Sequence, residues 1–416
     1  MGAAVRSVAI IGAGPAGSAL AFHLGRAGMK VALFERRSRP PIVVGESLVP
    51  ATVPFLRELG IEEEVRGYST YKRGATFVFN TEEKLSLRFA DVRGARTTYS
   101  YNVPRDRLDA SLTAVAEKSG AMIVRETARV ERIQGTDRVR LAPEALELTD
   151  GFFREQPDLI VDASGRARLL PNLLDLPFET GSRRDTALFA HCEGVAQVIE
   201  GDVHTDILEH GWGWRIPLPG KTSVGFVVDG DHVKTLGDSL EEQFDRILER
   251  EPVIRLWGPS PRRQSPVLKY ANYQLISTSG VGAGWALVGD SFGFVDPVFS
   301  SGLLLAFDGA AALSRAILSG GGPRPMGRYE AHVRNHVRAW QRMIEHFYDG
   351  RLFTLFRVGE AVKDSLLGRL LNPHFSRHLP LVFTGEATTS RYSVGLVEFM
   401  CMHGLLDNDP ESLRVH

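Results

Sequence analysis

Short apolar runs, each followed by glycine, set the pattern of the chain. Residues 8–11 form a β-branched run bounded by glycines, which is typical of a strand buried on both faces of a parallel sheet. A helical pattern of apolar residues follows from Pro15, and residues 30–35 predict a second strand. Residues 158–165 and 285–290 repeat the order of strand and then glycine. We therefore expect one parallel sheet that the chain visits three times.

A different pattern lies between these visits. Residues 75–79 and 222–228 alternate or run apolar in the way expected of antiparallel strands, and they predict a second sheet that faces a substrate. From about Tyr329 the pattern becomes helical, with arginines at positions 334, 338 and 342 on one face.

Composition changes this picture little. The chain has 416 residues, 43% hydrophobic and 24% charged, so it is long enough for two or three interleaved subdomains and is neither disordered nor fibrous. Its net charge of -1 offers no global field for nucleic acid or an anionic membrane. Charge is uneven only locally, because residues 324–377 hold 10 basic and 5 acidic residues.

Cysteine usage and the first residues bear on the compartment. Cys192 and Cys401 are too few for a disulfide framework or a thiolate metal cluster, which favours a reducing cytoplasm. The apolar stretch 8–24 is interrupted by glycines and a proline, so we expect neither a signal peptide nor a membrane span.

Two histidines have a spacing that can chelate a metal. His332 and His336 are four residues apart, but no third ligand follows and the usual glutamate is missing. We therefore interpret them as surface residues and predict no metal site. The chain also has no G-x-S-x-G elbow and no P-loop, so acyl and phosphoryl transfer have no basis in the sequence.

The first glycine turn carries a nucleotide-binding motif. Gly12-x-Gly14-x-x-Gly17 follows a strand and opens a helix, where a dinucleotide pyrophosphate needs backbone N–H groups without obstructing side chains. Glu35 ends the next strand, where a carboxylate binds ribose hydroxyls and repels a 2'-phosphate. The structural alternative is glycines that serve tight turns only, beside a solvated Glu35. The motif alone does not separate FAD from NAD.

Further motifs favour a flavin. Gly289-Asp290-Ser291 follows the third strand and precedes a predicted helix, which would place an acidic side chain near ribityl hydroxyls. Together with residues 161–166 and 103–105, this set resembles the flavoprotein monooxygenase superfamily over about residues 8–313. The resemblance implies an α/β fold, with a Rossmann-type FAD-binding domain, an interleaved antiparallel β-sheet substrate domain and a helical C-terminal region.

Three segments narrow the resemblance. Residues 212–217 match the W-x-W-x-I-P signature of flavin-dependent halogenases, residues 294–302 resemble that family's second signature, and Lys72 resembles its active-site lysine. The structural alternatives are core tryptophans on a strand and a surface lysine. The chain therefore resembles the flavin-dependent halogenase family.

That family's chemistry implies roles for these residues. Reduced FAD (FADH2), oxygen and chloride or bromide give hypohalous acid, and the backbone of Ser301 and Gly302 at a helix N-terminus would bind the halide. Trp212 and Trp214 would keep the substrate away from the flavin, and Lys72 would deliver the halogen.

One departure concerns the substrate. Tryptophan halogenases generally have a glutamate in the second signature where this chain has Phe299, so residues 297–302 look more like the phenol and pyrrole halogenases. Many of these take an aromatic substrate tethered to an acidic carrier protein in natural-product biosynthesis. Arg334, Arg338 and Arg342 would either dock such a carrier or form a solvated helix face, the latter being favoured.

The resemblance also implies the site residues and the domain boundaries. Flavin binding is assigned to Gly12, Gly14, Ala16, Gly17, Glu35, Arg36, Ser47, Arg105, Asp290, Pro297 and Gly302, and the substrate pocket to Trp212, Trp214 and Phe299. The FAD-binding domain is expected in three parts (1–74, 101–175 and 271–325), the substrate sheet in two (75–100 and 176–270), and the helical region at 326–416.

Partners and alternatives complete these expectations. A second G-x-G-x-x-G after a strand is missing, which favours a separate flavin reductase as the source of reduced FAD, with no nucleic-acid partner. The main alternative is an aromatic or polyketide hydroxylase on the same scaffold. A flavin-dependent reductase of isoprenoid double bonds and a non-catalytic flavin carrier or sensor are further alternatives.

Overall fold

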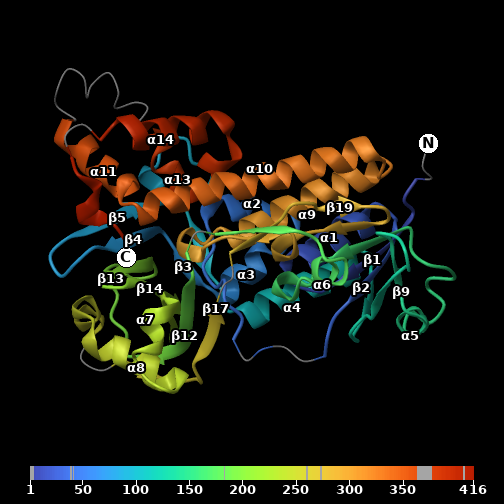
Figure 1. Cartoon of the computed structure of the whole chain (residues 1–416), viewed down its shortest axis with the longest axis horizontal. Helices are drawn as coiled ribbons and strands as arrows, with labels where there is room; N and C mark the ends of the chain where they lie inside the picture. Colours follow the sequence, from blue (N-terminus) through green and yellow to red (C-terminus); the bar gives the residue numbers. More distant parts are fainter. Residues whose placement is uncertain are drawn as a thin grey trace.

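Two large sheets and a group of C-terminal helices make up the molecule (Figure 1). The structure is a computed structural model, and it describes residues 4–37, 40, 42–181, 183–258, 261–271, 274–362, 377–405 and 408–416.

The first sheet has six strands in the order β19-β20-β10-β1-β2-β7. Its strands are β1 (Ser7–Ile11), β2 (Lys30–Phe34), β7 (Met122–Val124), β10 (Leu159–Asp162), β19 (Val281–Gly282) and β20 (Trp285–Leu287). All neighbouring pairs are parallel except β19 and β20. The inner residues Val8–Ile10 are fully buried, as expected of a strand covered on both faces. The predicted strands at 8–11, 30–35 and 285–288 are thus confirmed to within two residues.

Three helices cover this sheet and define its nucleotide side. They are α1 (Pro15–Arg26), α4 (Arg105–Lys118) and α9 (Gly302–Leu318), and α1 packs against both of the others. Because α1 begins directly after β1, its N-terminus lies at the carboxyl edge of the sheet.

The second sheet has eight strands in the order β16-β12-β15-β14-β13-β4-β5, with β17 also paired to β12. Its strands are β4 (Gly74–Val78), β5 (Lys84–Arg88), β12 (Asp185–Glu193), β13 (Val203–Leu208), β14 (Gly211–Leu218), β15 (Lys221–Asp229), β16 (Arg262–Arg263) and β17 (Leu268–Ala271). The pairs are antiparallel except β4 with β13, which are parallel. One face packs into the main core, and a smaller core of Phe226, Phe244 and Trp257 lies on the other under α8 (Leu240–Arg250).

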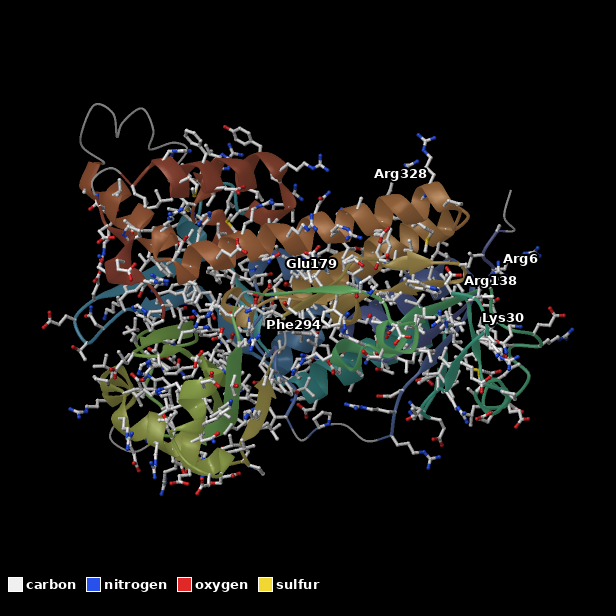
Figure 2. All side chains as sticks on the ribbon, in the orientation of Figure 1. Arg6, Lys30, Arg138, Glu179, Phe294 and Arg328 are labelled. Carbon is white, nitrogen blue, oxygen red and sulfur yellow. The ribbon has the colours of Figure 1, made fainter. Side chains whose placement is uncertain are left out.

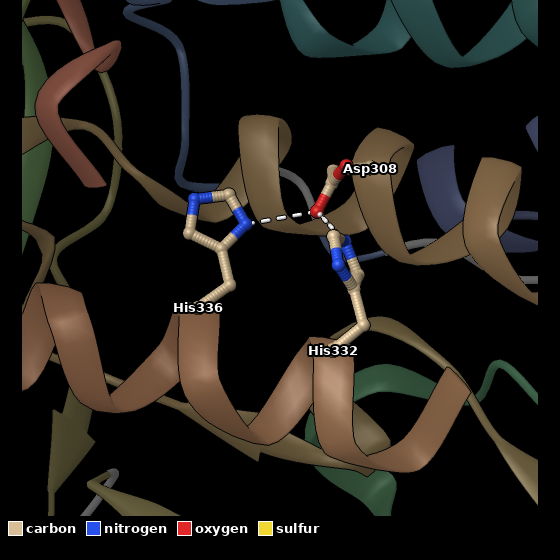
Figure 3. Close-up of side chains that lie close together, drawn as sticks. All are labelled: Asp308, His332 and His336. Atoms are coloured by element: carbon tan, nitrogen blue, oxygen red, sulfur yellow. Dashed lines mark hydrogen bonds and ion pairs between the residues drawn. The ribbon is translucent and has the colours of Figure 1, made fainter. Parts of the chain in front are cut away.

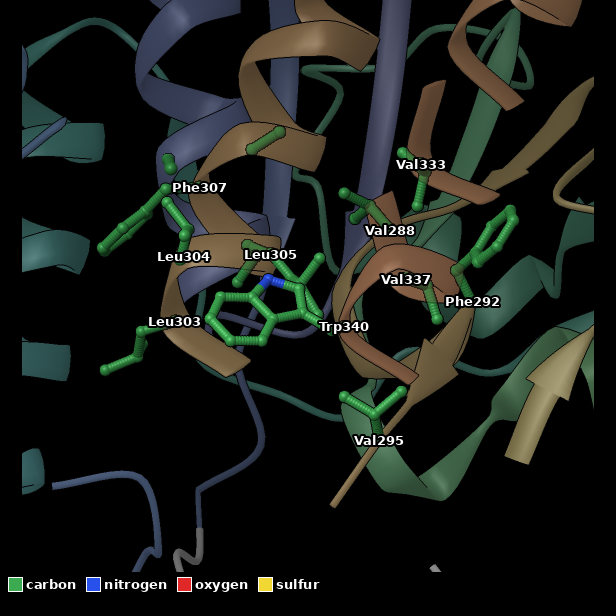
Figure 4. Close-up of a cluster of buried hydrophobic side chains, with 14 of the residues drawn as sticks. Val288, Phe292, Val295, Leu303, Leu304, Leu305, Phe307, Val333, Val337 and Trp340 are labelled. Carbon is green, nitrogen blue, oxygen red and sulfur yellow. The ribbon is translucent and has the colours of Figure 1, made fainter. Parts of the chain in front are cut away.

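The C-terminal helices lie along the top of the view in Figure 1. They include α10 (Pro323–Tyr348), α11 (Arg351–Val362), α13 (Leu381–Thr384) and α14 (Arg391–His403). Trp340 of α10 is fully buried and belongs to the same hydrophobic cluster as Leu303 and Leu305 of α9 (Figure 4). The long helix α10 therefore fixes α9, whose first turn belongs to the site described below.

Shorter elements connect these layers. They are η1 (Pro50–Thr52), α2 (Val53–Glu58), α3 (Glu62–Tyr68), β3 (Thr70–Lys72), η2 (Phe89–Asp91), β6 (Ser100–Asn102), β8 (Val130–Arg132), β9 (Val139–Leu141), α5 (Pro143–Glu147), η3 (Gly165–Ala167), α6 (Leu169–Leu173), β11 (Phe178–Thr180), α7 (Gly230–Lys234), η4 (Pro252–Trp257), β18 (Leu275–Ser277), η5 (Gly289–Ser291), β21 (Gly293–Phe294), η6 (Pro297–Phe299), η7 (Ala387–Thr389) and η8 (Pro410–Leu413).

The structure confirms the predicted fold class and corrects one local expectation. The helix predicted downstream of Asp290 is α9, which begins at Ser301 and Gly302 as expected, with a 3₁₀ turn (η5) and β21 in between. Ser291 Oγ lies 2.6 Å from the carbonyl of Asp162 and donates a hydrogen bond to it, so the chain is tied to β10 at this point. The helical C-terminal region begins at Pro323 rather than about Tyr329, since the glycines before Pro323 end α9 and open α10.

The domain boundaries stay a prediction.

Within the described part of the chain, no helix combines the length and the apolarity needed to cross a membrane.

Candidate active site

A cavity of about 710 Å³ lies between the two sheets. Its walls come from the turns after β1, β2 and β10, from η5, from the first turn of α9, and from the inner face of β12, β13, β14 and β17. Phe294, which also lines it, lies near the middle of the molecule in the view of Figure 2. A cavity at the carboxyl ends of parallel strands is where nucleotide cofactors bind in sheets of this kind.

The three glycines of the first turn lack side chains for different reasons. Gly12 has a φ of +114°, and a Cβ there would lie 2.3 Å from the carbonyl oxygen of Ala163. A Cβ on Gly17 would lie 1.9 Å from the carbonyl oxygen of Gly12. A Cβ on Gly14 would meet no atom within 4 Å, because Gly14 faces the cavity. The open cradle at Gly14, beside the N-terminus of α1, fits a pyrophosphate.

Polar side chains at both ends of this cradle fit the rest of FAD. Glu35 and Arg36 line the cavity directly after β2, where a ribose is expected. Arg105 donates from Nη1 to the carbonyl of Val44 at 2.6 Å and pairs with Asp109 at 3.1 Å, so its guanidinium is fixed at the cavity wall. Ala16, Ser47 and Pro297 line the same space.

Asp290 has the electrostatics of a hydroxyl-binding carboxyl. Burial raises its pKa to about 6, although the charges of Arg105 and Arg166 favour the ionised form. The carboxyl lines the cavity at η5, and an acceptor there suits the ribityl hydroxyls of a flavin. The cradle, the acidic groups at both positions and the size of the cavity together fit FAD.

Lys72 lies one hydrogen bond behind the cavity wall. Its side chain is 2% exposed, and Nζ donates to Ser47 Oγ at 2.9 Å and to the carbonyl of Leu48 at 2.8 Å. Burial lowers the pKa of Lys72 to about 7, and the charge of Asp202 only partly opposes this effect. Near neutral pH the ammonium and the free amine are therefore both populated. Lys72 does not itself line the cavity, but Ser47 does.

The two tryptophans of β14 form part of the cavity wall. Trp212 Nε1 donates to Tyr348 Oη at 2.9 Å, and Tyr348 Oη donates to Asp296 Oδ2 at 2.9 Å. Trp214 Nε1 donates to Ser223 Oγ at 3.3 Å. Because both indoles are buried and hydrogen-bonded, they are held in fixed positions in the cavity wall.

The predicted halide-binding turn opens α9. Gly302 lines the cavity and a Cβ on it would meet no atom within 4 Å, whereas the side chain of Ser301 is buried outside the cavity lining. Ser300, the residue before Ser301, has a φ of +55° and also lines the cavity. The free N–H groups of the first turn of a helix, together with its dipole, favour an anion at this place.

Phe299 lies apart from the cavity. Its ring packs against Trp340, Phe347 and Phe383, with centroids 5.7–6.1 Å away. Gly17, Lys72, Phe299 and Ser301 thus lie behind the cavity lining, and all the other predicted site residues are part of it.

The sequence interpretation missed a buried hydrogen-bonded pair at the cavity. Glu46 lines the cavity and its Oε1 lies 2.8 Å from His191 Nε2, with both side chains buried. Glu46 directly precedes Ser47, a predicted flavin-binding residue, so a local signal existed for it. His191 is on β12, far along the chain, and carries no signal in the sequence.

The arginines of α10 are paired within the chain. Arg334 donates to the carbonyl of Thr278 at 2.6 Å, and all three arginines form ion pairs, with Glu330, Glu179 and Glu398 in turn. The three side chains are 24–46% exposed, so they form a partly solvated face whose charges are paired within the chain. The histidine interpretation is corrected, because His336 is buried and Asp308 of α9 joins the pair.

Comparison with known proteins finds relatives that match most of the chain. A sequence model described as tryptophan halogenase matches residues 7–91 and 78–352. Tryptophan 2-halogenase from Chondromyces crocatus is 29% identical over 380 residues, covering 87% of this chain and 72% of that protein. The 1H-pyrrole-2-carbonyl-[peptidyl-carrier protein] chlorinase from Pseudomonas fluorescens is 28% identical over 444 residues, covering 98% and 95%. Flavin-dependent halogenase armH3 from Armillaria mellea is 30% identical over 340 residues, covering 74% of this chain and 66% of that protein.

Solved structures show the same fold. The myxobacterial chondrochloren halogenase CndH aligns with a TM-score of 0.72 at 26% identity, over 99% of this chain and 100% of that one. A flavoprotein/dehydrogenase from Cytophaga hutchinsonii aligns with a TM-score of 0.78 at 23% identity, over 96% and 99%, and is similar in fold alone.

The fold and the site define an FAD-dependent oxidoreductase. The chain belongs to the tryptophan halogenase family of flavin-dependent halogenases. The predicted family, the enzyme class and the use of FAD with a halide are thus confirmed, and the relatives named above give no support to a hydroxylase.

Proposed function

We propose that this halogenase acts on an electron-rich aromatic ring, phenolic or pyrrolic, in natural-product biosynthesis. The observation that carries the proposal is Lys72, buried beside the cavity with a pKa near 7. Phe299 supports the substrate class, because the position where tryptophan halogenases generally have a glutamate holds an apolar ring among aromatic neighbours. Phenol and pyrrole rings react with an electrophilic halogen without help from such a carboxylate.

The chain prepares the oxidant on one side of a barrier. Bound reduced FAD, with oxygen, supplies the oxidising equivalent that converts a halide into hypohalous acid. The first turn of α9 holds chloride or bromide through backbone N–H groups at Ser301 and Gly302. Trp212 and Trp214 keep an aromatic substrate from reaching the flavin, so direct transfer of oxygen to the ring is blocked.

Lys72 then delivers the halogen. As an ammonium it donates a hydrogen bond to hypochlorous acid and orients the chlorine. As a free amine it forms an N–Cl bond while the Cl–O bond breaks, and the hydroxide takes the amine proton to give water. The aromatic carbon takes the chlorine from nitrogen and loses its proton, which restores the amine. Either route needs hypochlorous acid to reach Lys72 Nζ itself, at the point where Nζ donates to the cavity-lining Ser47.

The substrate is proposed to arrive on a carrier protein. The support is the relative from Pseudomonas fluorescens, whose name specifies a peptidyl-carrier substrate and whose match spans 98% of this chain. The ion pairs of Arg334, Arg338 and Arg342 argue against these three as the docking site. We also propose that a separate reductase supplies the reduced FAD. A cytoplasmic location is part of the same proposal, because the two cysteines are free and buried.

The decisive experiment compares Lys72→Ala with Lys84→Ala, a control at an exposed lysine of β5. Each protein receives chemically reduced FAD, oxygen, chloride or bromide, and a panel of free and carrier-tethered phenols and pyrroles. Products are read by mass spectrometry from halogen isotope patterns. We expect the Lys72 variant to lose at least about 100-fold in halogenated product with unchanged FAD binding, and the control to match the wild type.

Two results would contradict the proposal. An unchanged yield in the Lys72 variant would remove the delivery role, and an added oxygen without halogen in the wild type would indicate a hydroxylase.

A further inference from the structure

A second cluster of chemically active side chains lies between α9 and α10 (Figure 3). His332 Nε2 and His336 Nδ1 lie 2.7 Å and 2.8 Å from the same oxygen, Oδ2 of Asp308. Three potential ligand atoms, one from each residue, lie within 4.8 Å of one another. The two histidines are one helical turn apart on α10, and the aspartate comes from the neighbouring helix.

The hydrogen bonds around His336 fix where its protons lie. Thr388 Oγ1 donates to the carbonyl of Gly385 at 3.1 Å, so it accepts from His336 Nε2 at 3.2 Å. In a neutral His336 the proton is therefore on Nε2, and the lone pair of Nδ1 faces the carboxylate of Asp308. The Nδ1 lone pair and the Asp308 oxygen thus face each other as two potential ligands of one cation.

Asp308 is the shared partner of both histidines. Its side chain is 19% exposed and that of His336 is 4% exposed, so both lie largely enclosed between α9 and α10.

We propose that Asp308, His332 and His336 bind a divalent transition-metal ion, with zinc as the ion of choice. Two imidazole nitrogens and one carboxylate oxygen are a recurrent ligand set for zinc, in which a water molecule takes the fourth position. His332 is 45% exposed, so an ion and its water reach the site from solvent.

The position of the cluster gives the metal a structural role. Asp308 lies on α9, whose first turn carries Gly302 at the FAD cavity, and it lines a separate cavity of about 740 Å³ on another side of that helix. The histidines lie on α10. A bound ion therefore links the two helices outside the FAD cavity, and the site is independent of how the substrate is halogenated.

The test measures zinc binding directly, on full-length protein without a polyhistidine tag. Calorimetric titration of metal-free wild type with zinc should give one site, and both His332→Ala and Asp308→Asn should weaken it by about tenfold or more. His332 is partly exposed and Asn matches Asp in shape, so both variants should fold. The matched control is His232→Ala, which breaks the close His210–His232 pair, with ring centroids 3.8 Å apart, and should leave this site intact.

Two independent readings complete the experiment. Cobalt(II) in place of zinc should give the visible spectrum of a four-coordinate ion in the wild type and the His232 variant only. Zinc should also raise the midpoint of thermal unfolding in the same two proteins, because an ion that binds only the folded state stabilises it. Equal zinc affinity in the wild type and in both cluster variants, or loss of binding only in His232→Ala, would overturn the proposal.

Discussion

Gly14 and Gly17 separate cofactor binding from folding at the scale of single residues. Gly14 has a φ of -74°, which any residue adopts, and its missing side chain leaves room only for a ligand. Gly17 instead allows α1 to lie against the first turn, since a Cβ there would overlap the carbonyl oxygen of Gly12.

This difference gives opposite expectations for two similar changes. Gly14→Val should weaken FAD binding by at least about tenfold while the unfolding of the FAD-free protein stays unchanged, because the valine fills the pyrophosphate cradle. Gly17→Ala should destabilise the FAD-free protein by about 1–3 kcal/mol through overpacking. Fluorescence titration with FAD and thermal unfolding of the FAD-free proteins measure the two effects. A stable Gly17→Ala protein or an unchanged FAD affinity in Gly14→Val would contradict this account.

At the scale of elements, β14 and β15 are fitted to each other around one indole. Gly225 of β15 lies directly opposite Trp214 of β14, and a Cβ on it would lie 2.1 Å from the indole ring. The glycine therefore makes the space in which Trp214 lies flat beside the cavity.

Gly225→Ala should displace that indole. We expect a loss of about 1–3 kcal/mol in unfolding free energy and a changed near-ultraviolet circular dichroism spectrum, because the ring must leave its position. Gly395→Ala on α14 adds the same methyl group where no atom lies within 4 Å, and it should not destabilise the protein. Denaturant unfolding of both variants is the measurement, and equal stability of the two would contradict the expectation.

Elements with strong local patterns were predictable from the sequence. The apolar run at residues 8–11 and the glycine after it define β1 and the start of α1, because a strand buried on both faces leaves a local trace. Residues 289–291 also follow a buried strand but form a 3₁₀ turn before β21, and Ser291 in this turn is bonded to β10, more than a hundred residues earlier in the chain.

Long-range pairing explains what the sequence did not show at the site. Glu46 and His191 meet across 145 residues, and Asp308 joins His332 and His336 from another helix. Asp308 lies on α9 and the histidines lie on α10, so residue spacing within one helix does not reveal this third ligand. By contrast, the glycine motif, Asp290 and the two tryptophans of β14 belong to local motifs, and these residues line one cavity.

At the scale of the whole molecule, Lys72 makes stability depend on pH. Its pKa is about 7 in the folded protein and about 10.5 in an unfolded chain, so between these values the unfolded state binds more protons. The free energy of unfolding therefore rises with pH across this range. Below pH 7 the buried Lys72 is an ammonium in the folded state, so the destabilisation by its burial is largest there.

The contribution of Lys72 can be isolated by difference. The wild type should gain unfolding free energy relative to Lys72→Met as pH rises from 7 to 10, by an amount on the order of a few kcal/mol. Groups that do not interact with Lys72 cancel in this difference, including Cys192, whose pKa burial raises to about 12. Denaturant unfolding at several pH values provides the measurement, and a pH-independent difference would mean that Lys72 keeps an ordinary pKa.

The spread of the cavity lining along the chain has a consequence for biosynthesis. The walls run from Ile11 to Ala306, and β10 and β20, which flank and extend the sheet beside β1, are made only at residues 159–162 and 285–287. A ribosome-bound chain therefore has its glycine turn early but no closed FAD cavity until about three quarters of the protein has been synthesised. Until then the apolar faces of β1 and α1 have only part of their partners, which makes the nascent N-terminal region a natural client for chaperones.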